Sequence, residues 1–161
     1  DDEEMREYTR ITRERFENFK IDYFTASNDV MKNMNQDKND RIVIRMNYMY
    51  RLNLENECIQ YLFKIINLAK SHNIELLFFI PPANYEYAEE LYGEKFYDAY
   101  SENCNKLKEA INEKGGKVLD LSYVLKQNEF ADMHTIDETA NYNGRVIVAD
   151  RISEVLCEGM E

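Results

Sequence analysis

The stretch LLFFIPPANYEY, residues 76–87, decides the fold of this chain. Residues 74–80 are predicted to form a strand, and their continuous apolar run over 76–80 is typical of a strand in a sheet that helices cover on both faces. Pro81 and Pro82 end this strand, because proline cannot donate a backbone hydrogen bond to a neighbouring strand. The sequence therefore predicts a buried strand whose carboxyl end leads into a stiff loop with an asparagine and two tyrosines.

A helix is predicted immediately before this strand, over residues 55–72, with Asn53 as its N-terminal cap. Its apolar residues recur on one helical face: Ile59, Leu62, Phe63, Ile66 and Ala69. His72, at the end of the helix, is interpreted as structural, because a histidine there satisfies the last carbonyl groups.

After the strand, a second helical region runs from about residue 85 to 113 and is broken near Gly93. One face of its later part is apolar, with Tyr100, Cys104, Leu107 and Ile111. Gly115-Gly116 stops this helix, and residues 117–122 form the next strand. A polar loop and a last helix, over about 144–156, complete this part of the chain.

The alternation of helices and strands predicts an α/β fold with right-handed βαβ connections. We expect an αβα sandwich with a small, mainly parallel sheet, preceded by an N-terminal helix that reaches about residue 20. Residues 41–46, RIVIRM, alternate and predict a short strand or an extended connection. Residues 1–40 are expected to form a helical segment and loop and residues 41–161 the α/β domain, together one compact domain.

Composition narrows the classes of function. With 31 acidic against 20 basic residues, the formal charge of −11 argues against nucleic acid as a partner. No stretch reaches the roughly 20 apolar residues of a membrane span.

The three cysteines have neither metal-site nor disulfide spacing, so no metal or cofactor is predicted, and Cys58 and Cys104 are expected in the core. The chain starts at Asp1 without a signal-like segment, so we expect a removed leader or a longer protein.

The candidate site lies beyond the carboxyl ends of the two strands, where open α/β sheets bind ligands. The loop over residues 130–145 should reach the same edge. It holds His134 between Asp132 and Asp137, and a carboxylate beside an imidazole is the pairing that a general base needs. Alternatively, both aspartates cap turns and His134 is a solvated loop residue. Ser122 follows a strand, but no glycine-flanked elbow exposes its hydroxyl.

The order of LLFFIPPANYEY, LDLS (119–122) and an Asp- and His-bearing loop before NGRVIVADRI (143–152) resembles the C-terminal half of SGNH (GDSL-type) hydrolases. Within them it is most similar to the membrane-anchored D-alanyl-lipoteichoic acid biosynthesis (DltD) group. The resemblance covers about residues 55–157. It implies a flavodoxin-like sandwich, an extracytoplasmic location and a Ser–His–Asp triad that transfers or removes acyl groups on wall polymers.

Residue roles follow from the same resemblance. His134 with Asp132 or Asp137 would be base and orienting carboxylate. The substrate side would be formed by Pro82, Asn84, Tyr85 and Asn141. Aligned on Gly144, however, Ala140 or Asn141 stands where the family has its histidine, and no Gly-Asp-Ser triplet for the nucleophile occurs in the chain.

Three hypotheses follow. The chain is part of, or a divergent relative of, a cell-surface acyltransferase or esterase, with an acyl-carrying partner and a membrane anchor in another segment. Alternatively, it is a non-catalytic module that binds a cell-envelope polymer or a membrane partner through the tyrosines after the Pro-Pro turn, Tyr85, Tyr87, Tyr92 and Tyr97. The third possibility is a purely structural α/β domain.

Overall fold

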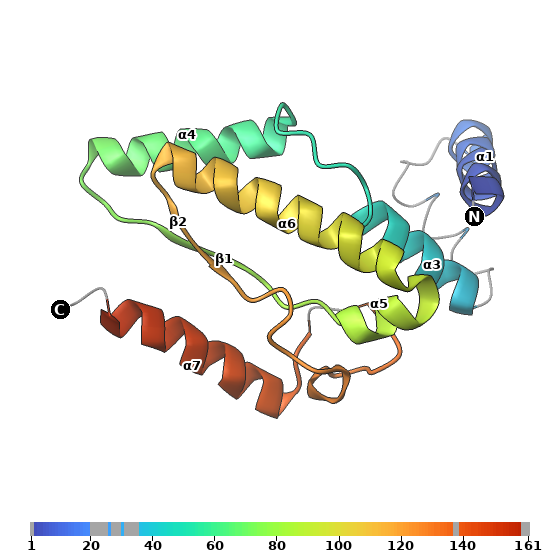
Figure 1. The fold of residues 1–161 in the computed structure, drawn as a ribbon. Coiled ribbons are helices and arrows are strands. Elements are labelled where there is room, and N and C mark those ends of the chain that lie inside the picture. Colours follow the sequence, from blue (N-terminus) through green and yellow to red (C-terminus); the bar gives the residue numbers. More distant parts are fainter. Residues whose placement is uncertain (1, 20–25, 27–29, 31–35, 137–138, 159–161) are drawn as a thin grey trace. The chain divides into compact units, whose positions relative to one another are not determined.

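The computed structural model describes residues 2–19, 26, 30, 36–136 and 139–158 of the chain (Figure 1). The chain divides into two compact units, Asp1–Asn47 and Tyr48–Glu161. In the first unit, helices α1 (Asp2–Phe19) and α3 (Gln36–Asn47) share a small apolar core. The predicted N-terminal helix is confirmed.

The prediction of a strand or extended connection at residues 41–46 is wrong, because α3 covers this segment. Ile42 and Ile44 are both buried, although they lie on different sides of a helix. Burial on two sides produces the same alternation of apolar residues as a half-buried strand, so the periodicity of this short run is ambiguous.

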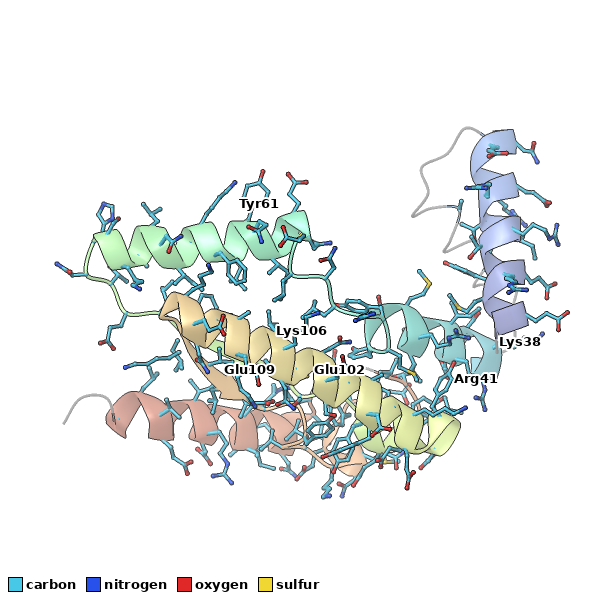
Figure 2. The ribbon with its side chains drawn as sticks, turned by 45° about the horizontal axis from the view of Figure 1, so that its top comes forward. Lys38, Arg41, Tyr61, Glu102, Lys106 and Glu109 are labelled. Atoms are coloured by element: carbon cyan, nitrogen blue, oxygen red, sulfur yellow. The ribbon has the colours of Figure 1, made fainter. Side chains whose placement is uncertain are left out.

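The second unit contains the α/β fold. Its elements in chain order are α4 (Glu57–Ser71), β1 (Leu77–Ile80), α5 (Tyr85–Tyr92), α6 (Glu94–Lys114), β2 (Lys117–Asp120), the 3₁₀ helix η1 (Gln127–Glu129) and α7 (Tyr142–Glu158). Helices α4 and α6 lie on one side of the strands and α7 lies on the other (Figure 1 and Figure 2). The predicted order of elements is confirmed.

Strands β1 and β2 pair in parallel, from Leu77 opposite Lys117 to Ile80 opposite Asp120. The α/β class with a small parallel sheet is therefore confirmed, and the sheet of the described residues has two strands. Phe78 and Val118 pack against the core that α4 and α6 form, with Phe63, Ile66, Ala110 and Ile111 at its centre.

The opposite face of β1 is more open than its apolar sequence predicts. Phe79 is 50% exposed, because α7 packs mainly through its first turns, where Ile147 and Val148 contact the cluster around Leu125 and Phe130. The expectation of a strand buried on both faces is therefore wrong at this position.

Glycines separate the helices as predicted. Gly93 lies between α5 and α6 with φ of 60°, and Gly115 ends α6 in the left-handed conformation with φ of 87°. A Cβ on Gly116 would lie 2.7 Å from Cγ2 of Ile111, so this residue lets the chain turn close against the core.

Two local predictions are wrong. The cap of α4 is Asn56, whose Oδ1 accepts a hydrogen bond from the backbone N–H of Cys58, whereas Asn53 closes the preceding turn at Glu55. Asparagines three positions apart both suit a cap, and the geometry of the turn selects between them. Cys58 is exposed at this helix start, while Cys104 is buried as expected.

Replacing Ile66 with alanine should lower the free energy of unfolding by about 2–5 kcal/mol, because it opens a cavity in a packed core. Ile65 is the matched control, since it neighbours Ile66 on α4 but is 53% exposed, against 1% for Ile66. Ile65→Ala should cost less than about 1 kcal/mol. Urea denaturation measures both, and equal losses would contradict this placement of the core.

Candidate functional site

Three segments meet at the carboxyl edge of the sheet, as the sequence predicts. The backbone N–H of Ala83, after β1, donates to the carbonyl of Ser122, after β2, at 3.3 Å. The loop before α7 reaches the same edge through Asn84. The edge is therefore a single surface assembled from both strand ends and the loop.

Asn84 is fully buried, and its side-chain amide holds the loop in place. Nδ2 donates to the carbonyl oxygens of Met133 at 3.1 Å and Thr135 at 3.0 Å, with a longer contact of 3.5 Å to that of Asp132. Oδ1 accepts from the backbone N–H of Tyr87 at 3.4 Å and so caps α5. The structure thus places Asn84 beneath the loop as an anchor, with its polar atoms engaged by backbone.

The carboxylate of Asp132 accepts a hydrogen bond from the backbone N–H of His134 at 2.8 Å, which closes a tight turn. The imidazole of His134 lies edge-on to the ring of Tyr87, with 6.2 Å between the ring centroids, and the residue is exposed. Asp137 lies outside the described residues. Within the described part of the chain, no hydrogen bond joins the imidazole to a carboxylate.

Asn141 ties the start of α7 to η1. Its Nδ2 donates to the carbonyl of Asn128 at 2.8 Å, and its Oδ1 accepts from the backbone N–H of Gly144 at 3.1 Å. Ala140, one of the two positions at which the resemblance aligns the family's histidine, is buried against Leu125. This position therefore contributes to packing at the base of the loop.

Ser122 is also buried, with 1% of its surface exposed, and its hydroxyl donates to the carboxylate of Asp120. Lys108 pairs with the other carboxylate oxygen at 3.0 Å. Burial raises the pKa of Asp120, but the hydrogen bonds from Ser122 and Lys108 outweigh it and leave the pKa below its usual value. Burial, with the nearby charge of Asp120, raises the pKa of the Cys104 thiol. Neither Ser122 nor Cys104 has the exposed, activated geometry of a nucleophile.

Tyr85, Tyr97 and Tyr123 form a tyrosine cluster at this edge. Their centroids lie 5.0 Å apart for Tyr85 and Tyr123, and 5.2 Å apart for Tyr97 and Tyr123. Lys126 Nζ donates to the hydroxyl of Tyr85 at 3.0 Å and pairs with Glu86 at 3.1 Å. The sequence analysis names Tyr85 and Tyr97 as candidate binding residues. It misses Tyr123 and Lys126, which only the tertiary structure brings next to them.

The hydroxyl of Tyr123 is buried and has no hydrogen-bond partner among the described residues. Burial raises the pKa of this phenol above its usual value, so the group stays neutral at physiological pH. The cluster therefore combines aromatic rings with one flanking ion pair, between Lys126 and Glu86.

Comparisons with known protein families, with characterised proteins and with solved structures find no match to this chain. Every helix in the described segments is too short or too polar to cross a membrane. The same residues contain no group of three or more His, Cys, Asp or Glu placed to hold a metal ion.

Asn84→Asp should lower the free energy of unfolding by about 1–3 kcal/mol, because a carboxylate cannot donate to the loop carbonyls. Hydrogen exchange of the amides of residues 132–136 should accelerate. Asn56→Asp is the matched control: this side chain only accepts, at a helix N-terminus, so the aspartate should be neutral or slightly stabilising. Urea denaturation and hydrogen exchange are measured for both variants. Unchanged exchange rates of residues 132–136 in the Asn84→Asp variant would refute the role of Asn84 as the anchor of the loop.

Proposed function

We propose that this chain is an SGNH-like module that binds a cell-envelope polymer without itself carrying a hydrolase centre. The observation that carries the proposal is the tyrosine cluster at the carboxyl edge of the sheet. Tyr97 is 48% exposed, and Tyr85 is partly exposed beside it. Tyrosine rings offer a rigid apolar surface with a polar tip, which suits stacking on sugars and polymer chains.

Polar groups next to the cluster add the means of orienting a ligand. Lys126 and Glu86 lie beside Tyr85, and a few convergent polar groups around aromatic side chains are typical of binding sites. The Lys126 hydrogen bond fixes Tyr85, so little conformational entropy is lost on binding.

Ser122 is buried, and neither Ala140 nor Asn141, the two positions at which the resemblance aligns the family's histidine, carries a general base; both observations support binding rather than hydrolysis. The flavodoxin-like sandwich, the extracytoplasmic location and anchoring through another segment belong to the same proposal. All three rest on the resemblance to SGNH proteins.

Tyr97→Ala should weaken binding of the protein to purified lipoteichoic acid or wall polysaccharide about fivefold, because it removes a stacking surface worth about 1 kcal/mol. Tyr61→Ala is the control, since Tyr61 is exposed to a similar degree, 52%, but lies on α4 outside the cluster (Figure 2). Surface plasmon resonance measures both variants. Binding that is absent, or equally weak in both variants, would refute the proposal.

A second candidate function is acyl transfer or ester hydrolysis on envelope polymers, with His134 as general base and a nucleophile from outside this chain. The exposure of His134 on a loop anchored at the carboxyl edge favours it. Asp132 would then have to turn from its backbone contact to the imidazole.

In the complete protein, His134→Ala should lower hydrolysis of p-nitrophenyl acetate at least about a hundredfold, the usual contribution of a general base. His72→Ala, at the exposed end of α4, should leave the rate unchanged. Equal rates for the His134 variant and the unmodified protein would exclude the base, and turnover by neither would favour the binding module.

A further inference from the structure

An irregular segment, residues 48–52, is held against α6 by the side chains of Asn103 and Lys106. Asn103 Nδ2 donates to the carbonyl oxygens of Tyr48 at 3.2 Å and Tyr50 at 2.6 Å, and Oδ1 accepts from the backbone N–H of Leu52 at 2.9 Å. Lys106 adds a hydrogen bond of 2.6 Å to the carbonyl of Leu52. The segment is therefore rigid although it belongs to no helix or strand.

The two ends of the segment are also held by packing. The ring of Tyr48 meets that of Tyr100 edge-on, with 5.6 Å between centroids, and Leu52 is buried. Between these fixed points the segment and α6 enclose a half-open cavity of about 420 Å³. It is lined by Met49, Tyr50, Arg51, Ala99, Glu102 and Asn103. This volume lies within the usual range for small-molecule sites.

The lining combines one cation, one anion and an apolar wall. Arg51 comes from the segment and Glu102 from α6, and within the described residues neither forms an ion pair. Met49, Ala99 and the half-exposed Tyr50 supply the apolar part. A ligand with only a negative charge would be repelled by Glu102, and one with only a positive charge by Arg51.

We propose that this cavity binds a small zwitterion of the amino-acid type. Its carboxylate pairs with Arg51, its ammonium group pairs with Glu102, and its apolar side chain lies against Met49 and Tyr50. Arginine suits a carboxylate because its planar guanidinium can donate two parallel hydrogen bonds. The cavity shares no lining residue with the tyrosine cluster, so this proposal does not depend on the proposed function.

The test is a titration of the ¹⁵N-labelled protein with leucine, N-acetylleucine and leucine amide, followed by NMR. Leucine should shift the amide signals of residues 49–51 and 99–103 saturably. N-acetylleucine lacks the ammonium group and leucine amide lacks the carboxylate, so both should bind about tenfold more weakly. No saturable shift with leucine, or equal affinity for all three probes, would overturn the proposal.

Substitutions at Arg51 and Glu102 test the two proposed ion pairs with the ligand. Both side chains are exposed, so neither substitution should unfold the protein. Arg51→Gln should reduce leucine binding to the level of leucine amide, and Glu102→Gln should reduce it to the level of N-acetylleucine. Glu109→Gln is the matched control, because Glu109 is exposed two turns further along α6, outside the cavity (Figure 2). An equal loss of affinity in the Glu109 variant would show that net charge alone is responsible and would also overturn the proposal.

Discussion

The buried amide of Asn84 is the interaction on which the carboxyl edge of the sheet depends. One side chain caps α5 and holds the backbone of the loop before α7, so the end of β1, a helix and a distant loop share a single anchor. A buried carbonyl without a donor is costly, and an amide can both donate and accept. Because its amide both donates and accepts, Asn84, which the sequence analysis predicts on the substrate side, satisfies buried backbone groups in the structure.

Asn103, in the middle of α6, plays the same role for the irregular segment of residues 48–52. Both asparagines satisfy the backbone of irregular chain where no sheet or helix can do so, and both thereby make a surface rigid. At Asn84 the surface is the carboxyl edge with its tyrosine cluster, and at Asn103 it is the cavity beside Arg51. A surface that is already held in one conformation loses less conformational entropy when a ligand binds, which supports our proposal of a binding site at each.

The geometry of the carboxyl edge bears differently on the two proposed functions, polymer binding and acyl transfer or hydrolysis. A serine hydrolase needs an exposed hydroxyl within hydrogen-bond reach of a base that a carboxylate orients. Here the hydroxyl of Ser122 points to Asp120, and the Asp132 carboxylate bonds to backbone instead of to an imidazole. The exposed rings of the tyrosine cluster do not depend on that geometry, and this is why we propose binding as the function.

The sequence by itself determined the order of helices and strands in the second unit, the glycine breaks, and the convergence of two strand ends with the loop before α7. These features follow from periodicity, from proline and glycine, and from the rule that parallel strands end at one edge. Only the tertiary structure decided which polar residues face inward. Asn84 and Ser122 are polar by type but buried by packing, and the alternation at Ile42 and Ile44 belongs to a helix buried on two sides. The partners of a side chain come from segments distant in sequence, so spacing along the chain cannot reveal them.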